Sequence, residues 1–172
     1  MELVDLYDEN RLPLGKTAER RAPRAPGEYR TVVHVCVFDS RGRLLIQQRT
    51  PRKFIFPNLW DVSVGGGVDA GETSRQGAER EFREELGLAL DLSGLRPSVT
   101  VNFDGGFDDF YLLTRDLDLA ELTLQEEEVL AVRWASLPEI LDMCGRGTFI
   151  PYPEGFLRFL FDMRDQFGFP TK

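Results

Sequence analysis

The chain has 172 residues, which is long enough for one domain with a substantial hydrophobic core. Apolar residues make up 42% of the sequence and charged residues 29%, as in ordinary soluble globular proteins. The formal net charge of −8 argues against binding to nucleic-acid polymers, which would need a basic face, but a nucleotide-sized anion needs only a few local cations. No apolar run approaches the roughly 18 residues of a membrane span, and the acidic opening MELVDLYDEN does not resemble a signal peptide. We therefore expect a cytoplasmic protein without a membrane partner.

The first 28 residues are predicted to form a strand and an irregular arm. Residues 2–7 alternate apolar and polar side chains, which predicts a short edge strand, and residues 12–14 are a candidate returning strand. Residues 17–27 contain two prolines and little apolar content, which is typical of an irregular arm. We expect its arginines to be solvated, although they could reach a phosphate: Arg20, Arg21 and Arg24. We assign residues 1–28 to this segment, packed on a single domain of residues 29–172.

Two strands of a hairpin follow. Residues 29–38 are β-branched and almost continuously apolar, which predicts a buried strand, and residues 43–49 predict its partner. His34 is the only histidine of the chain, and a lone histidine in a buried strand is usually a neutral, hydrogen-bonded core residue rather than a substrate contact. Arg49 ends the second strand and Lys53 lies four residues further on, so the two cations could clamp a diphosphate.

The middle of the chain predicts a strand, a glycine-rich loop and a helix. Residues 60–64 predict the strand, and the glycines at 65–67 would let the backbone approach a ligand closely. Thr73 followed by Gln76 is a capping-box signature that begins the helix, and Gly87 ends it.

This helix carries three acids close to its C-terminus. Glu81, Glu84 and Glu85 are three or four residues apart and project to one side, at the seam between solvent and the buried face that includes Ala78 and Phe82. Like charges at this spacing repel, and the helix dipole disfavours anions there, so the arrangement suggests a compensating Mg²⁺ or Mn²⁺ bound together with phosphates. The alternative is a solvated acidic face, because charge runs usually only make a protein soluble.

The remaining residues predict three further strands and two helices. Residues 96–103 and 107–114 predict a hairpin, and Asp108 and Asp109 lie near its tip. Their carboxylates could support the site from behind its ligands, but we expect them to be solvent-exposed. Four phenylalanines could either stack on a nucleobase or belong to the core: Phe54, Phe56, Phe103 and Phe107. The last elements are a strand and two helices with predicted ranges 129–134, 137–143 and 153–167. These elements together predict an α/β fold, an α/β/α sandwich with a central mixed sheet.

The spacing around the helix carries a family resemblance. Gly66 is followed after five residues by Glu72, and after seven more by the run REFREELGL that begins at Arg80. This pattern resembles the Nudix box without a mismatch. The resemblance implies the Nudix fold, an ion pair between Glu72 and Arg80 that holds the loop to the helix, and a Mg²⁺-dependent hydrolase. Its substrates would be phosphoanhydrides in which a nucleoside diphosphate is linked to another moiety.

The resemblance also assigns roles to residues. It implies that Glu81 and Glu85 bind the metal, with Glu84 as a further ligand and the carbonyl of Gly65 as a fourth contributor. Nudix enzymes often take an additional acid from a loop at about residues 126–128. We choose Glu128 as that ligand or general base, because it adjoins the next strand, and a solvated turn is the alternative.

Beyond the box, the chain is similar to the branch that contains isopentenyl-diphosphate isomerase. The similarity includes the opening VDLYDEN, His34, and Arg49 with Lys53. In the isomerases the matching cations contact the diphosphate, so Arg49 and Lys53 are our candidate substrate-binding residues. The isomerases carry Cys-Gly-His where this chain has glycines at 65–67, and glycine supplies neither the thiol nor the histidine that isomerisation needs.

Three hypotheses follow. The leading one is a metal-dependent pyrophosphohydrolase of a nucleoside diphosphate or another small phosphoanhydride, and the alternatives are an isomerase-like enzyme and a catalytically silent diphosphate-binding module. The sequence does not identify the substrate, the general base or the number of metal ions. The resemblance is compatible with a homodimer, but no stretch of the sequence requires one.

Overall fold

The computed structural model describes residues 2–166. It contains three α-helices and nine β-strands within that range, together with one turn of 3₁₀-helix. The strands are β1 Leu3–Tyr7, β2 Pro13–Glu19, β3 Arg30–Phe38, β4 Leu44–Arg49, β5 Trp60–Asp61, β6 Val64–Gly67, β7 Val99–Phe103, β8 Gly106–Thr114 and β9 Val129–Ala135. The helices are α1 Ser74–Leu86, α2 Leu137–Gly145 and α3 Glu154–Met163, and the 3₁₀ turn is Leu119–Glu121. No helix among these residues is long and apolar enough to cross a membrane.

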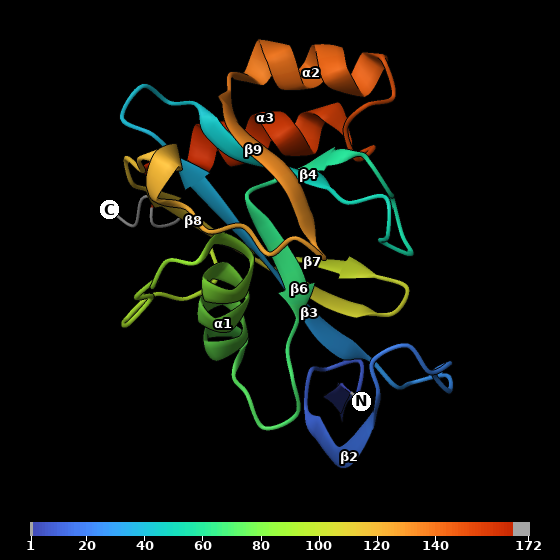
Figure 1. The fold of residues 1–172 in the computed structure, drawn as a ribbon. Helices are drawn as coiled ribbons and strands as arrows, with labels where there is room; N and C mark the ends of the chain where they lie inside the picture. Colours follow the sequence, from blue (N-terminus) through green and yellow to red (C-terminus); the bar gives the residue numbers. More distant parts are fainter. Residues whose placement is uncertain (1, 167–172) are drawn as a thin grey trace.

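A mixed sheet forms the centre of the molecule (Figure 1). Its main path runs β5-β4-β3-β8-β7, in which β3 and β8 are parallel and the other neighbours are antiparallel. β6 pairs with β3, and β9 pairs with β4. The predicted hairpin of β3 and β4 is present, but these strands pair only where Phe38 faces Leu44 and diverge beyond that point.

The predicted strand at 60–64 is two short strands, β5 and β6, which pair with β4 and β3 respectively where those two strands diverge. Asp61 still pairs with Gln47 of β4, whereas Val64 pairs with Val35 of β3. Ser63 fills the gap, because its hydroxyl accepts a hydrogen bond from the Val37 amide (2.9 Å) and donates one to the Leu45 carbonyl (2.6 Å). This crossing places the glycines of β6 beside β3, with Gly66 against Glu81 of α1.

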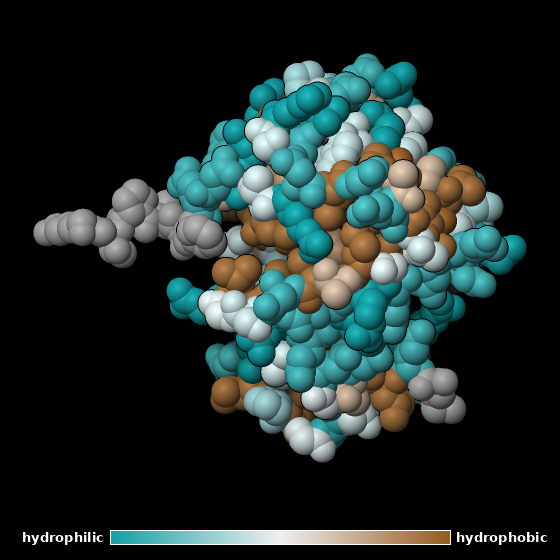
Figure 2. All heavy atoms as spheres, turned by 60° about the vertical axis from the view of Figure 1, so that its left-hand side comes forward, coloured by the Kyte–Doolittle hydropathy of each residue, from teal (hydrophilic) through white to brown (hydrophobic). Residues whose placement is uncertain are grey.

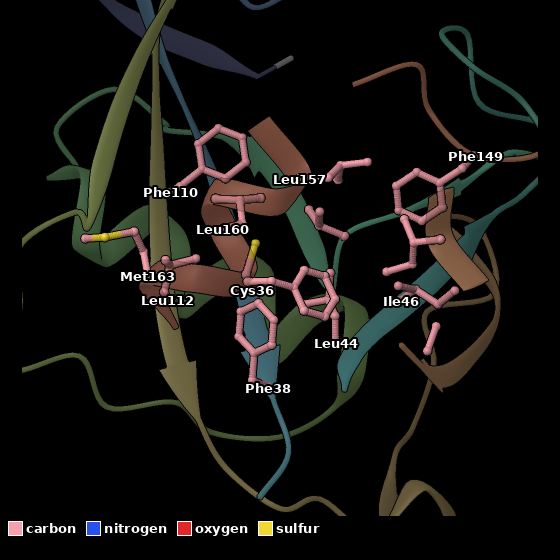
Figure 3. Close-up of a cluster of buried hydrophobic side chains, with 14 of the residues drawn as sticks. Cys36, Phe38, Leu44, Ile46, Phe110, Leu112, Phe149, Leu157, Leu160 and Met163 are labelled. Carbon is pink, nitrogen blue, oxygen red and sulfur yellow. The ribbon is translucent and has the colours of Figure 1, made fainter. Parts of the chain in front are cut away.

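Two hydrophobic cores lie on opposite faces of the sheet and confirm the α/β/α sandwich. One core joins α1, through Ala78, Phe82 and Leu86, to alternate residues of β3 such as Val33 and Val35. The other core joins Cys36 and Phe38 of β3 to α2 and α3, and Figure 3 shows these two side chains among those of α3. α3 ends at Met163, before the predicted end at residue 167, which lies outside the described residues. On the face shown in Figure 2, hydrophilic residues cover most of the surface and hydrophobic ones gather in a band.

The N-terminal segment is a hairpin docked on the sheet. β2 extends to Glu19, well into the segment predicted to be an irregular arm, and Tyr7 pairs with Tyr29 just before β3. Arg11 binds both carboxylate oxygens of Asp109 and lies 5.4 Å from the centroid of the Phe107 ring. The prediction that Asp109 is exposed is wrong, because its side chain is fully buried between Arg11 and the Thr100 hydroxyl (2.6 Å). The division of the chain at residue 28 stays a prediction.

Candidate active site

α1 begins and ends as its sequence predicts. Thr73 and Gln76 form the capping box, and Gly87 ends the helix in the left-handed conformation (φ 74°). Glu81 and Glu85 face inward and are 7% and 2% exposed, whereas Glu84 is exposed. Two of the three acids are therefore buried beneath the seam where they were expected to lie, and only Glu84 reaches solvent.

Arg80 connects the helix to the segment before it. Its guanidinium donates hydrogen bonds to both carboxylate oxygens of Glu72 (2.9 and 3.0 Å) and to the carbonyl of Gly67 (2.8 Å). It also donates to Glu81 (3.0 Å) and Glu84 (3.1 Å). The expected ion pair between Glu72 and Arg80 is present, and the same guanidinium sets the orientation of two of the acids.

The glycines at 65–67 are a strand, not the predicted loop. They pair with His34, Val33 and Val32 of β3 in that order. A Cβ at residue 65 would lie 2.7 Å from the His34 ring, and one at residue 67 would lie 2.8 Å from Nε of Arg20. The His34 ring and the end of the Arg20 side chain thus occupy the space that side chains at residues 65 and 67 would fill.

The two buried carboxylates of α1 repel each other. Burial, followed by the charge of Glu81, raises the pKa of Glu85 from 4.5 to about 7, although Lys53 and a hydrogen bond from Gln47 (3.1 Å) act in the opposite direction. Burial also raises the pKa of Glu81, despite its contact with Arg80. This pair of oxygen donors is therefore short of positive charge, which is the property expected of a site for a hard divalent cation.

The acids do not form a closed ligand cage. Within residues 2–166, no three side chains of the His, Cys, Asp or Glu types converge closely enough to hold a metal ion. Arg80 draws the Glu81 and Glu84 carboxylates toward its own guanidinium, and Gln47 engages Glu85. The donor set still fits Mg²⁺ or Mn²⁺, because both ions are bound in proteins through one or two carboxylates plus substrate phosphates and water.

A cavity of about 710 Å³ opens beside these acids. Its acidic wall contains Glu81, Glu84 and Glu85, and the backbone of Gly65 also lines it. Basic residues line the other parts of the cavity: Arg20, Arg21, Arg24, Arg30, Arg49 and Lys53. The cavity therefore places the candidate metal ligands and the candidate diphosphate-binding residues around one space.

Three of the sequence candidates for substrate binding and catalysis meet at this cavity. Lys53 forms an ion pair with Glu128, and burial lowers the pKa of Lys53. Arg49 binds the carbonyl of Ile55 (3.0 Å) and lies 3.5 Å from the carboxylate of Asp61. Glu128 lies in the turn before β9 with its side chain partly exposed, and it is also part of the cavity wall.

A buried polar network supports the site from behind. Asp61 is 2% exposed and accepts a hydrogen bond from the Tyr152 hydroxyl (2.9 Å). His34 bonds to Asp108 (2.7 Å), so the expected exposure of Asp108 is wrong. Burial lowers the pKa of His34, but the charge of Asp108 and the hydrogen bond to it outweigh that effect and raise the pKa overall. The expected hydrogen bond of this histidine is thus present.

Several residues of the site were missed or misread from the sequence. Gln47 and Tyr152 carry no motif, and only the fold brings them to Glu85 and Asp61. Of the arm arginines, which were expected to be solvated, Arg21 is exposed and Arg20 and Arg24 are half-buried. All three line the cavity, and Arg20 packs over Gly67 of β6. Among the four phenylalanines, Phe54 and Phe103 line the cavity, whereas Phe107 is buried against Tyr29 and Phe56 lies outside the cavity lining.

Known proteins are similar to this chain in sequence and in fold. The chain matches the NUDIX domain over residues 28–152. It is 47% identical over 165 residues to an uncharacterized Nudix hydrolase of Listeria monocytogenes, with 96% of each chain covered. It is 32% identical over 152 residues to an isopentenyl-diphosphate Delta-isomerase of Streptomyces coelicolor, covering 86% of this chain and 77% of the isomerase.

Solved structures agree with this relationship. A crystal structure of a Deinococcus radiodurans protein is similar to the chain with a TM-score of 0.75 at 27% identity, covering 92% of this chain and 99% of that one. The MutT protein of Methanosarcina mazei has the same fold with a TM-score of 0.63 at 23% identity, covering 84% and 99%. The domain match spans most of the chain, and the Listeria relative covers nearly all of it. The chain therefore belongs to the Nudix family, and it is a hydrolase of that family.

Proposed function

We propose that this hydrolase is a metal-dependent pyrophosphohydrolase that cleaves a phosphoanhydride bond in a nucleoside diphosphate or a related small molecule. The observation that carries the proposal is the pair of buried, mutually repelling carboxylates of Glu81 and Glu85 on the wall of a cavity that six or more basic side chains also line. A cavity of about 710 Å³ has the size of a small-molecule site, so the proposed partner is a small substrate and not a nucleic-acid polymer.

The residues present would hold the metal through Glu81 and Glu85, with Glu84 and the Gly65 carbonyl as additional oxygen donors. Mg²⁺ or Mn²⁺, when bound, neutralises phosphate charge and lowers the pKa of an attacking water. Arg80 keeps Glu81 and Glu84 oriented, since one guanidinium bonds to both.

Arg49 and Lys53 are the cations that bind the diphosphate. Arg49 has a forked guanidinium that is held by Asp61 and the Ile55 carbonyl, and it matches the geometry of phosphate oxygens. Lys53 is engaged by Glu128 in this structure. When Lys53 turns to a phosphate, the Glu128 carboxylate is released beside the cavity, where it can accept the proton of the attacking water.

An isomerase has less support in the geometry. The spaces at residues 65 and 67, where the isomerases carry a thiol and a histidine, are filled here by the His34 ring and by Arg20. Neither glycine can transfer a proton to or from carbon. Incubation with isopentenyl diphosphate tests this alternative, because an isomerase would yield the dimethylallyl product.

A substrate screen tests the proposed function. Nucleoside di- and triphosphates, dinucleotides and sugar nucleotides would be incubated with Mg²⁺ or Mn²⁺, and released phosphate or monophosphate measured. We expect turnover that Glu85→Gln abolishes and that Glu121→Gln, in the 3₁₀ turn away from the cavity, leaves unchanged. Turnover that survives Glu85→Gln would overturn the metal assignment, and no turnover across the screen would favour the silent binding module.

A further inference from the structure

The basic wall of the cavity extends beyond the residues that the proposed reaction uses. Arg30, at the start of β3, lies three residues before Val33, which pairs with Gly66, and a Cβ at Gly66 would meet the carboxyl group of Glu81. At the rise of an extended strand, the Cα atoms of Arg30 and Val33 are roughly 10 Å apart. The backbone of Arg30 is thus separated from the point where Glu81 reaches β6, although Arg30 and Glu81 line the same cavity.

The backbone of Arg30 is held in place by the turn between β7 and β8. Its backbone amide donates to the Gly105 carbonyl (3.0 Å), and a Cβ at Gly106 would lie 1.8 Å from the Arg30 carbonyl oxygen, so only glycine lets β8 approach this closely. Its guanidinium lies 5.5 Å from the centroid of the Phe103 ring. Within residues 2–166, that guanidinium makes no hydrogen bond and no ion pair, although it lines the cavity.

The arm brings further guanidinium groups to the same wall. Arg24 donates to three arm carbonyls, those of Glu19 (3.0 Å), Ala22 (2.6 Å) and Arg20 (3.2 Å), and so fixes the path of the arm. Arg20 then packs over Gly67 and pairs with Glu2 (2.8 Å). The pKa of Arg30 is lowered by its burial and then by the charges of Arg20 and Arg24. The positive charges of Arg20, Arg24 and Arg30 repel one another, and an anion bound between them would offset this unfavourable repulsion.

We propose that Arg30, together with Arg20, binds a second anionic group of the substrate, separate from the diphosphate that is cleaved. This inference rests on the proposed pyrophosphohydrolase function and narrows its substrate class to diphosphates whose distal moiety carries a further phosphate. The forked N–H groups of a guanidinium match the oxygens of a phosphate. Two guanidinium groups on one wall of the cavity suit the double negative charge of the additional phosphate. The exposed ring of Phe54 lines the same cavity and can pack against the moiety that joins the two anionic groups.

Matched pairs of probes test the inference. Coenzyme A and its 3′-dephospho form, and likewise NADPH and NADH, share a diphosphate linkage and differ by a single phosphate outside it. We expect a kcat/KM about 10- to 100-fold higher for the phosphorylated member of at least one pair, as charge-assisted hydrogen bonds of roughly 1.5–3 kcal/mol imply. Arg30→Gln should reduce this preference to near unity and leave the other member unaffected. The matched control Arg41→Gln removes one charge from the turn before β4, outside the cavity, and should leave the preference intact.

Binding measurements separate this inference from the proposed function. Calorimetry with the Glu85→Gln variant reports affinity for each probe without turnover. Tighter binding of a phosphorylated member that Arg30→Gln abolishes supports the second anion site, even if no probe is hydrolysed. Equal affinity and equal kcat/KM for the members of both pairs would overturn the second site and leave the hydrolase proposal standing. If Arg30→Gln reduced affinity and kcat/KM equally for both members of a pair, the second anion site would also be overturned, because Arg30 would then act on the diphosphate or on the fold.

Discussion

A Cβ at Gly66 would lie 2.0 Å from the carboxyl carbon of Glu81. The absence of a side chain on β6 therefore determines where an acid of α1 can be. Gly66→Ala must displace Glu81 or push β6 away from α1, and a misplacement of about 1 Å at a catalytic group can cost roughly 100-fold in rate. We expect kcat to fall by about that factor while the fold is retained by circular dichroism. Gly155→Ala, where a Cβ meets nothing within 4 Å, is the matched control, and equal activity of both variants would contradict the role of this contact.

Arg80 is predicted to be needed for both stability and activity. Its guanidinium binds Glu72, the Gly67 carbonyl and two acids of α1 at once. Arg80→Gln would leave buried acceptors unpaired, at a cost of roughly 3 kcal/mol in the free energy of unfolding, measured by urea denaturation. Arg80→Lys should recover little, because a single ammonium cannot satisfy a forked set of acceptors. Arg83→Gln, an exposed position of the same helix, should change the unfolding free energy by much less; a comparable loss there would contradict the prediction.

The pKa of Glu85 predicts an unusual pH dependence for the metal-free protein. A group whose pKa is raised in the folded state, here from 4.5 to about 7, stabilises the fold below pH 4.5, and that contribution is lost as the pH rises toward 7. The loss is on the order of 3 kcal/mol. Glutamine resembles the protonated acid, so Glu85→Gln should match the wild type near pH 4.5 and be more stable at pH 8. Urea denaturation in the presence of a chelator measures this, and a variant that is less stable at pH 8 would contradict it.

Tyr152 is predicted to position Arg49 without touching the substrate. Its hydroxyl donates to Asp61, and the same carboxylate faces Arg49. Tyr152→Phe removes one hydrogen bond to a buried carboxylate, which should loosen Arg49 and raise KM by about tenfold, with a smaller effect on kcat. Tyr29→Phe, outside the cavity, is the control. A fall in kcat with unchanged KM would contradict the positioning role.

The sequence predicted the layered fold and the helix of the site because these depend on local signals. Apolar periodicity identified the main strands, and the capping box with Gly87 fixed both ends of α1. The strand at 60–64 is divided because it changes partners from β4 to β3, a change that depends on the divergence of those two strands. No local pattern reports such a divergence.

The residues whose surroundings were predicted wrongly all make contacts with residues far away in the sequence. Asp108 and Asp109 lie in a stretch that looks solvent-exposed, but β8 is parallel to β3 at the centre of the sheet, and their partners His34 and Arg11 are far away in sequence. The glycines at 65–67 looked like a loop because glycine signals backbone freedom, whereas here it makes room for His34, Glu81 and Arg20. Long-range contacts of this kind are visible only once the chain is folded.

Manganese binding tests the central claim, which is that Glu81 and Glu85 hold a divalent cation at the cavity. Electron paramagnetic resonance at pH 8 measures the free Mn²⁺ that remains as the wild type and Glu85→Gln are titrated with the ion, with Glu121→Gln as the control. The account predicts saturable binding to the wild type and to the control, and a large loss of affinity in Glu85→Gln. Equal Mn²⁺ affinity in the wild type and in Glu85→Gln would contradict it.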